Sequence, residues 1–494
     1  MDLQTLTRSL VLKKVIGDAN IEITGLTTDS REVKPGYCFI AIRGFTVDGH
    51  RFIPQALERG AAVIVTEEEV DTESVVVRVP DTRRAMAVLA ATYFRHPTRE
   101  LKVIGITGTN GKTTTAHLIR RILMDAGKKA GLVGTIDMKI GEESFPVKNT
   151  TPDVVELQRS FRRMVDAGCS HAVIEVSSHA LHQGRTWGIY CKTGVFTNLT
   201  QDHLDYHKTM EHYRASKGLL FSQLGNRVED TATDQPLAVL NADDEASPYY
   251  SGITPAQVLT YGVEGAADVQ AWDIRIDAGG TRFTLITPMG ETAVHMKLMG
   301  KFSVYNALAA TAAALGEGIP LEGIRRSLET IGGVDGRLEP VHAGQPFTVL
   351  VDYAHTPDSL QNVLSTVREF TRGSVLCVVG CGGDRDRGKR PIMAEIAARL
   401  SERVFITSDN PRTEDPDRII ADMLEGVSAF PKERVTVIRD RAEAISRAVQ
   451  EAEPEDVVLI AGKGHETYQE IDGIRHDFDD RSVAWKAIQC FLKK

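Results

Sequence analysis

Residues 102–114 have the sequence KVIGITGTNGKTT, which begins as an apolar strand and continues into a glycine-rich turn. Apolar residues at helical spacing follow at Leu118, Ile122 and Leu123. Backbone N–H groups of such a turn bind phosphate oxygens together with the N-terminus of the helix behind it. The segment Gly108-Thr-Asn-Gly-Lys-Thr meets the general Gly-x4-Gly-Lys-Thr pattern only in part. Its strand–turn–helix context nevertheless predicts a phosphate-binding loop, and an ordinary glycine turn is the alternative.

Strand-like runs recur around this loop and alternate with helical patterns. Such alternation predicts a mainly parallel sheet that is covered by helices. Residues 268–298 instead alternate apolar and polar residues around the turns Gly279-Gly280 and Met289-Gly290, which predicts a small antiparallel insertion. Residues 303–315 predict an alanine-rich helix. The strands predicted for this middle section are 102–107, 171–176, 193–197 and 237–240.

The first hundred residues form a separate predicted unit. Its strands are 61–66 and 75–79, followed by a helix over 82–94 with Asp81 or Thr82 as N-cap. His96-Pro97 ends the helix, because the residue before a proline avoids the helical region.

The last section again shows a doubly wound pattern of strands and helices. We therefore expect an α/β protein with three domains: 1–98, a central P-loop ATPase with a parallel sheet at 99–337, and a Rossmann-like dinucleotide fold at 338–494. The strands predicted for the last domain are 347–351, 374–379, 403–407, 434–438 and 456–461.

Length and composition agree with this organisation. At roughly 150 residues per domain, 494 residues suggest about three domains. The 58 Lys and Arg against 67 Asp and Glu give a net charge of −9, which counts against a nucleic-acid-binding protein. The 6 Cys include no Cys-x-x-Cys pair, which excludes a zinc ribbon or a disulfide scaffold. We see no signal peptide and no apolar run near the ~20 residues that span a bilayer, so we expect a cytoplasmic protein without membrane insertion.

Two polar residues follow strands of the middle section. Glu175 ends the strand 171–176 and is the type of residue that holds the metal in P-loop proteins, whereas a solvated strand end is the alternative. His203 follows the strand 193–197, where the crevice of an α/β sheet opens, although a lone histidine is more often structural. Lys217, taken alone, is expected to be an exposed helical lysine.

Three charged loops follow strands of the last section, at 380–387, 408–412 and 461–466. Arg385 and Arg412 suit a carboxylate or phosphate through a bidentate guanidinium. Because Glu466 suits an ammonium, the set predicts an amino-acid site, and solvated loop charges are the alternative.

Five motifs in collinear order resemble those of the Mur ligases, the ATP-dependent amino-acid ligases of peptidoglycan assembly. They are Gly108-Thr-Asn-Gly-Lys-Thr-Thr114, Glu175-Val-Ser-Ser-His179, Tyr213-Arg-Ala-Ser-Lys217, Asp352-Tyr-Ala-His355 and Gly462-Lys-Gly-His-Glu466. The match begins at Thr28-Asp-Ser-Arg31 and reaches the C-terminal region. The resemblance implies an N-terminal UDP-binding domain, a central ATPase and a C-terminal domain that brings the amino acid.

The resemblance also implies roles for particular residues. Lys217 would be carbamylated by CO₂, which turns a cation into an anionic oxygen ligand suited to Mg²⁺. The catalytic residues implied are Lys112, Glu175, His203 and Lys217, and the Mg²⁺ ligands are Thr113, Glu175, His203 and carbamylated Lys217. The ATP-binding residues implied are Gly108, Thr109, Asn110, Gly111, Lys112, Thr113, Thr114, Asn306, Arg337 and Asp352.

The implied substrates are ATP, UDP-N-acetylmuramoyl-L-alanyl-D-glutamate and meso-diaminopimelate. Arg412 can pair with the second carboxylate of diaminopimelate, whereas lysine would leave a buried arginine unpaired. The amino-acid site implied is Arg385, Asp409, Asn410, Pro411, Arg412, Gly462 and Glu466. The site for the UDP-peptide is Thr28, Ser30, Phe45, Thr46, Val47, Asn149, Thr150, Thr151, Ser177, Gln183 and Arg185.

The implied reaction transfers the γ-phosphate of ATP to the D-glutamyl carboxylate, and the amine then displaces phosphate from the acyl phosphate. The rival ligases are folylpolyglutamate synthetase and the ligase that adds D-Ala-D-Ala, which share the ATPase core but should lack the Asp409-Asn-Pro-Arg412 tetrad. A rival of another class is a non-enzymatic P-loop switch or binding module. A switch would need an Asn-Lys-x-Asp motif that the sequence lacks, and a binding module would not need the full set of metal, lysine and arginine positions. We expect the ligase to be a monomer.

Overall fold

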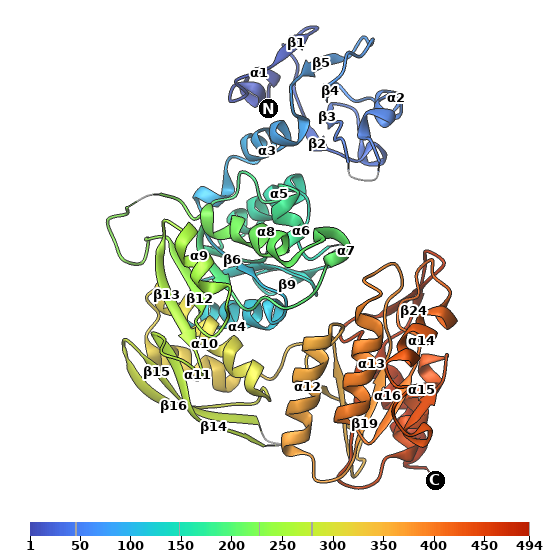
Figure 1. Cartoon of the computed structure of the whole chain (residues 1–494). Helices are drawn as coiled ribbons and strands as arrows, with labels where there is room; N and C mark the ends of the chain where they lie inside the picture. The colour runs from blue at the N-terminus through green and yellow to red at the C-terminus, as the bar shows by residue number, and fades with distance from the viewer. Residues whose placement is uncertain (45–46, 148, 227, 278–279, 494) are drawn as a thin grey trace.

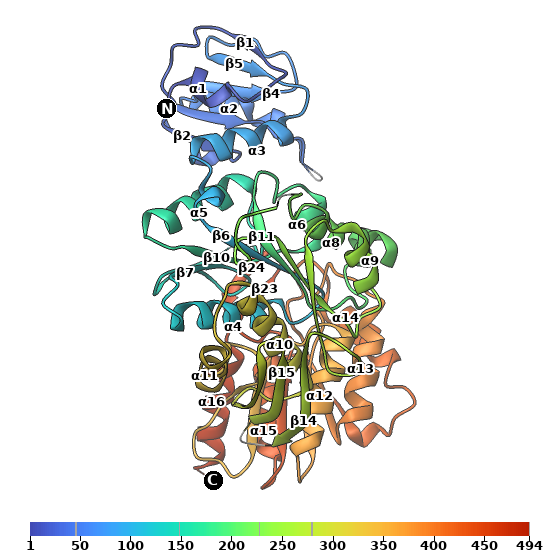
Figure 2. The same ribbon diagram turned by 90° about the vertical axis from the view of Figure 1, so that its left-hand side faces the viewer.

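The computed structural model describes residues 1–44, 47–147, 149–226, 228–277 and 280–493 (Figure 1). Its α/β units follow one another along the chain, with the N-terminal unit at one end of the molecule and the C-terminal unit against the far side of the central one (Figures 1 and 2). The predicted site residues Phe45 and Thr46 and the turn residue Gly279 lie outside the described residues. Within the described ranges, no helix is both long enough and apolar enough to cross a membrane.

The N-terminal unit is built on a five-stranded sheet in the order β1-β5-β4-β3-β2. The outer β1 pairs antiparallel with β5, and the other neighbours pair in parallel. The predicted strands at 61–66 and 75–79 are confirmed as β4 and β5, and Asp81 is the N-cap that was expected for α3. The elements are α1 (Leu3–Thr7), β1 (Lys14–Ile16), β2 (Gly25–Thr27), β3 (Tyr37–Ile40), α2 (Ile53–Glu58), β4 (Val63–Thr66), β5 (Val75–Arg78) and α3 (Thr82–Tyr93).

The central unit contains an eleven-stranded sheet in the order β16-β15-β14-β13-β12-β11-β6-β10-β7-β8-β9. The strand before the glycine-rich turn, β6, lies in its middle and pairs in parallel with β10 and β11. The loop at its carboxyl end therefore opens where ligands bind in such sheets. The elements up to β13 are β6 (Lys102–Thr107), α4 (Lys112–Asp125), β7 (Ala130–Val133), β8 (Met138–Ile140), β9 (Glu143–Phe145), α5 (Val154–Asp166), β10 (His171–Glu175), α6 (Ser178–His182), β11 (Cys191–Phe196), α7 (Leu204–His207), α8 (Met210–Ser222), β12 (Leu237–Asn241), α9 (Ser247–Ile253) and β13 (Gln257–Gly262).

The antiparallel strands expected over 268–298 are confirmed. They are β14 (Val269–Asp277), β15 (Gly280–Thr287) and β16 (Gly290–Met296). β14 pairs in parallel with β13 through Tyr261 and Gly262, so the three strands extend the main sheet. Sequence alternation reports which face of a strand is buried and not which strand it joins, so the pairing of β14 with β13 was not predicted. The alanine-rich α10 (Lys301–Gly316) and α11 (Leu321–Thr330) follow.

The C-terminal unit has a six-stranded sheet in the order β17-β18-β22-β19-β20-β21. The strands β18 to β22 are parallel, as the doubly wound pattern predicts, and only β17 is antiparallel. The five predicted strands of this section are confirmed. The elements are β17 (Glu339–Pro340), β18 (Thr348–Asp352), α12 (Pro357–Phe370), β19 (Val375–Val379), α13 (Lys389–Leu400), β20 (Arg403–Ile406), α14 (Pro416–Glu425), β21 (Val435–Val437), α15 (Arg441–Glu451), β22 (Val457–Ala461), β23 (Tyr468–Ile471), β24 (Ile474–Asp477) and α16 (Asp480–Phe491).

Candidate active site

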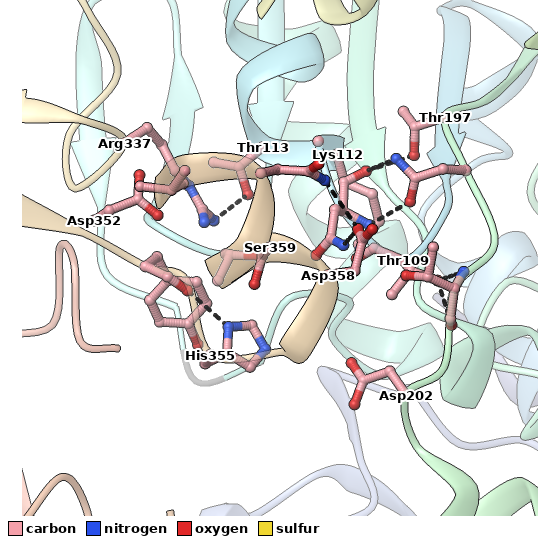
Figure 3. Close-up of a pocket in the computed structure, with 18 of the residues that line it drawn as sticks. Thr109, Lys112, Thr113, Thr197, Asp202, Arg337, Asp352, His355, Asp358 and Ser359 are labelled. Atoms are coloured by element: carbon pink, nitrogen blue, oxygen red, sulfur yellow. Dashed lines mark hydrogen bonds between the residues drawn. The ribbon is translucent and has the colours of Figure 1, made fainter. Parts of the chain in front are cut away.

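A cavity of about 560 Å³ lies between the carboxyl ends of the central strands and the C-terminal unit. The glycine-rich turn forms one wall, and the start of α12 faces it (Figure 3). The loops after β19, β20 and β22 and further residues of the central unit, among them Glu175, His203 and Asn306, complete the lining. Segments that the sequence separates by more than three hundred residues therefore face one space.

The glycine-rich turn has the geometry of a phosphate-binding loop. Gly111 has φ +84°, and a Cβ there would lie 2.4 Å from Asn306 Oδ1, so only glycine fits without displacement. The next residue, Lys112, begins α4, and its Nζ donates to Gly108 O and Thr109 O, each at 2.9 Å. Burial lowers the pKa of Lys112, and the charges of Glu175 and Asp202 oppose this shift. The predicted loop therefore has a lysine and a helix N-terminus at the cavity wall.

The buried carboxylate of Glu175 faces the loop from the end of β10. Its Oε2 accepts hydrogen bonds from Thr113 Oγ1 and Thr135 Oγ1, both at 2.9 Å, and its Oε1 accepts from Thr135 N at 2.9 Å. Arg337 Nη2 donates to Thr113 Oγ1 at 3.2 Å. A carboxylate beside a threonine hydroxyl is an oxygen donor set that suits Mg²⁺.

Lys217 is not the exposed helical lysine that its local sequence suggests. Its side chain is buried, and its Nζ donates to Gly108 O at 2.8 Å and lies 4.3 Å from the Tyr213 ring centre. Burial and the nearby charge of Lys112 lower its pKa well below the usual value. The expectation was wrong because the side that α8 buries faces the glycine-rich turn, a contact that spans more than one hundred residues of sequence.

His203 lies at the N-cap of α7 in a left-handed conformation, with φ +56°. Its ring packs edge-on against His179 at 4.8 Å between ring centres, and its Nε2 lies 3.4 Å from Asp202 Oδ2. Burial lowers the pKa of His203, so the ring is neutral at neutral pH. A neutral imidazole is the form that can ligate a metal ion.

The wall supplied by the start of the C-terminal unit contains Arg337 and Asp352. Asp352 Oδ2 accepts a hydrogen bond from Leu338 N at 2.7 Å, and burial raises the pKa of Asp352 to about 6. Arg337 lies over the Tyr353 ring, 4.6 Å from its centre. Both side chains line the cavity together with Asn306, as the prediction of a nucleotide site requires.

Besides the hydrogen bond from Arg337 to Thr113, another bond joins the glycine-rich turn to the start of α12. Asn110 Nδ2 donates to Asp358 Oδ2 at 2.8 Å, and Asp358 lies in the first turn of α12 (Figure 3). Sequence reasoning did not single out Asp358, because nothing local marks a helix-start aspartate as a partner of a distant loop.

The predicted amino-acid loops also meet at the cavity, and a second layer of charges holds them. The residues of the set that line the cavity are Arg385, Asp409, Asn410, Arg412, Gly462 and Glu466, whereas Pro411 does not. Arg412 Nη1 donates to Gly383 O at 2.7 Å. The buried Arg390 pairs with Glu414 at 2.8 Å, and Glu414 also accepts from Asp384 N at 2.6 Å. These contacts tie the loop after β19 to the loop after β20.

Lys463 is the main residue that sequence reasoning missed here. Its side chain is fully buried, and its Nζ donates to Glu466 Oε2 at 2.9 Å and to Asn410 Oδ1 at 3.0 Å. Asn410 Nδ2 donates to the same Glu466 oxygen at 2.8 Å. Burial raises the pKa of Glu466, and the charge of Lys463 opposes this shift. The only signal in the sequence was the position of Lys463 inside the Gly462–Glu466 motif.

The residues predicted for the UDP-peptide divide into two groups. Ser177 N donates to Thr151 Oγ1 at 3.0 Å, and Arg185 donates to Thr151 O at 3.1 Å and to Gln183 Oε1 at 2.6 Å, so these four lie together. Thr150 and Ser177 line the main cavity. The N-terminal unit carries Thr28, Ser30 and Val47, outside this cavity, and Asn149 does not line it either.

The fold and the cavity define a class of protein: a three-unit α/β protein in which a phosphate-binding loop faces a doubly wound C-terminal unit. Family models match the chain over residues 22–94 (Mur ligase family, catalytic domain), 106–314 (Mur ligase middle domain) and 336–464 (Mur ligase, glutamate ligase domain). The chain belongs to the Mur ligase family.

Individual relatives are similar over the whole length. The chain is 54% identical over 489 residues to the UDP-N-acetylmuramoyl-L-alanyl-D-glutamate--2,6-diaminopimelate ligase of Geobacillus thermodenitrificans, covering 99% of both chains. It is 52% identical to the ligase of the same name from Bacillus cereus, covering 99% of this chain and 98% of the relative. A solved structure of a ligase with this name is 34% identical, with a TM-score of 0.69 and 99% of both chains covered. MurF from Acinetobacter baumannii, 21% identical with a TM-score of 0.70, covers 100% of this chain and 99% of its own and shares the fold.

Proposed function

We propose that this chain is an ATP-dependent ligase that adds meso-2,6-diaminopimelate to the D-glutamate of UDP-N-acetylmuramoyl-L-alanyl-D-glutamate. The observation that carries this function is the single cavity that the phosphate-binding loop shares with the amino-acid loops. Full-length relatives at 52–54% identity with the corresponding name support the choice of substrates. The product is the UDP-N-acetylmuramoyl tripeptide of peptidoglycan synthesis, and we place the enzyme in the cytoplasm as a monomer.

The reaction needs an activated carboxylate, because a carboxylate is a poor acyl donor. A D-glutamyl oxygen forms a bond to the γ-phosphorus of ATP, and ADP leaves. The amine of diaminopimelate then attacks the acyl carbon, loses a proton, and displaces phosphate. Lys112 and Arg337 offset the negative charge that builds up between phosphate and carboxylate in the cavity.

We assign the metal sites to Thr113, Glu175 and His203, which line the cavity, and to Lys217, which lies buried against the glycine-rich turn. Bound Mg²⁺ would supply positive charge beside the phosphates, held at one site by Thr113 and Glu175 and at the other by His203 and the carbamate of Lys217. The lowered pKa of Lys217 supports this assignment, because only a neutral amine attacks CO₂. Its burial beside the glycine-rich turn also fits a group that acts on the phosphates.

The amino-acid site would bind diaminopimelate by its charges at both ends. Arg412 and Arg385 suit its carboxylates, and Glu466 suits an ammonium. Both described hydrogen bonds of the Glu466 carboxylate end on Oε2, so Oε1 is the oxygen that we assign to the substrate. Asn410 acts mainly by holding Glu466 in place.

The test is phosphate release from ATP in the presence of UDP-N-acetylmuramoyl-L-alanyl-D-glutamate, with meso-diaminopimelate compared with L-lysine. We expect release that requires all three substrates and occurs with diaminopimelate. Release with lysine instead would preserve the reaction but contradict the role of Arg412. No release with either amino acid, from folded enzyme supplied with CO₂ and Mg²⁺, would overturn the proposed function.

A further inference from the structure

A second cavity, of about 550 Å³, lies where the N-terminal unit joins the central unit. One side of α3 forms its floor, the loop 186–190 forms a wall, and the ends of α1 and α8 contribute Ser9 and Gln223. None of the described residues among those predicted for ATP, for the UDP-peptide or for diaminopimelate lines it. Its volume is within the range of small-molecule sites.

The charge of this cavity is opposite to that of the whole chain. Its lining contains Arg84, Arg99 and His96 and no aspartate or glutamate, whereas the chain has a net charge of −9. Arg84 forms an ion pair with Asp81, with 3.1 Å between Arg84 Nε and Asp81 Oδ2, but Asp81 does not line the cavity. Burial lowers the pKa of His96, so the two guanidinium groups supply the positive charge. The cavity is therefore complementary to an anion.

Each of these arginines lies over an aromatic ring. The Arg84 guanidinium carbon is 5.4 Å from the centre of the Trp187 ring, and that of Arg99 is 6.0 Å from the centre of the Tyr190 ring. Hydrogen bonds hold the backbone of the loop that carries both rings. Trp187 N donates to Gly184 O at 3.1 Å, and Tyr190 N donates to Thr98 Oγ1 at 3.3 Å. Alanine, valine and isoleucine side chains complete an apolar lining. Flat rings beside arginines suit a planar aromatic ligand that bears a negative charge.

We propose that this cavity is a binding site for a small planar aromatic carboxylate, distinct from the active site. The cavity wall includes the connection between the two units, where Arg95 and His96 both adopt left-handed φ values of +59° and +50° before Pro97. Two consecutive non-glycine residues in this conformation are costly, so the joint depends on the packing around it. A ligand held between α3 and the 186–190 loop therefore fixes the angle between the two units.

The same helix, α3, also contacts the segment of the central unit that carries Gln183. Arg83, next to Arg84, donates to Gln183 O at 3.2 Å and to Arg43 O at 3.0 Å. Gln183 belongs to the predicted UDP-peptide site, so this part of the inference rests on the proposed function. Coupling between two sites is reciprocal. The aromatic carboxylate therefore changes the affinity for the UDP-peptide by the same factor by which the UDP-peptide changes the affinity for the carboxylate.

The probe for the site is 2-naphthoate, titrated by calorimetry into the full-length protein. We expect saturable binding, with the Kd for the uncharged isostere 2-naphthamide weaker by about tenfold, since the two ligands differ in the charge that the arginines contact. The double variant Arg84→Gln/Arg99→Gln should weaken 2-naphthoate by about tenfold, and Trp187→Leu should weaken both ligands. Arg59→Gln, an exposed arginine of the N-terminal unit, is the matched control. Unchanged thermal unfolding keeps a loss of binding separate from a loss of fold.

Two results would overturn the proposed site, and a third would overturn only its coupling to the UDP-peptide. Equal binding of the acid and the amide would contradict the charge argument. Binding that survives the double arginine variant but is lost in Arg412→Gln would place the ligand in the main cavity instead. Binding at the expected residues without any change in the KM for the UDP-peptide would refute the coupling alone, and it would leave both the site and the proposed ligase reaction standing.

Discussion

The phosphate-binding loop and the amino-acid site face the same cavity, but the chain builds them in different ways. The loop comes from one continuous strand–turn–helix segment, β6 to α4, in which Lys112 bonds to Gly108 and Thr109, although distant residues such as Lys217 also contact it. The amino-acid site comes from three loops that follow β19, β20 and β22, and long-range charge pairs hold those loops together. A contiguous motif can therefore be recognised locally, whereas an assembled site depends on residues whose function is only to position others.

The largest expected effect is in the phosphate half, at Lys217. Replacing it with alanine removes the group that we assign as a metal ligand, and we expect kcat to fall about 10³-fold. If an anionic oxygen is what is missing, added formate should restore part of the activity to Lys217→Ala. Activity is measured as phosphate release, with the exposed Lys432→Ala as control. An alanine variant within tenfold of the parent would contradict the carbamate assignment.

The next effect is in the amino-acid half, at Lys463. In Lys463→Met the Glu466 carboxylate stays buried without its cation. We therefore expect kcat/KM for diaminopimelate to fall about 10²-fold, which corresponds to roughly 3 kcal/mol. Because burial raises the pKa of Glu466 and Lys463 opposes this, the variant should lose more activity at about pH 6 than at about pH 8.

The KM for ATP of Lys463→Met tests whether the phosphate half and the amino-acid half of the cavity are independent. It should stay unchanged in Lys463→Met, since Lys463 contacts Asn410 and Glu466 but not the glycine-rich turn. Lys486→Met, an exposed lysine on α16, is the matched control. An equal increase in the KM for ATP and in the KM for diaminopimelate would mean that Lys463 stabilises the whole C-terminal unit. Thermal unfolding would then show a loss of stability as well.

A smaller effect is expected at Arg412. Lysine at this position keeps the charge but loses the bidentate guanidinium, so kcat/KM for diaminopimelate should fall about tenfold in Arg412→Lys. The measurement is a parallel titration of diaminopimelate and ATP. A decrease shared by both substrates, or no decrease at all, would show that Arg412 does not contact the amino acid.

The comparison between the two regions also explains what the sequence could predict. Strands such as β6 and β22 were predicted nearly to the residue, because continuous apolar runs mark buried parallel strands. The strands β1 and β2 were missed, since each has only three residues and includes Lys14 or Gly25, whereas the short β4 and β5 lie in continuous apolar runs. The pairing of β14 with β13 was not predicted, because periodicity shows the buried face of a strand and not its neighbour.

The candidate site follows the same division. Lys112 and Thr113 were placed by their motif, and the structure puts both at the cavity. Lys463, Glu414 and Asp358 were not singled out, because each acts through a partner that is distant in sequence or hidden in a loop. A charged residue shows its own chemistry in the sequence, but its partner appears only when the chain is folded.

The smallest expected effect is on thermal stability at acid pH, and it concerns Glu414 in the amino-acid half of the cavity. Hydrogen bonds from Arg390 lower the pKa of Glu414 to about 2, although burial opposes the shift. A carboxyl whose pKa is lowered on folding stabilises the native state above its unfolded pKa, and this contribution is lost as the pH falls toward the folded value. The difference in Tm between the parent and Glu414→Gln should therefore be largest near pH 7 and should shrink between about pH 4.5 and about pH 2. Glu425→Gln, an exposed glutamate of the same unit, should show no such trend. A constant difference in Tm across this range would mean that Glu414 holds the amino-acid loops together by packing rather than by charge. The amino-acid site would then differ less from the phosphate-binding loop.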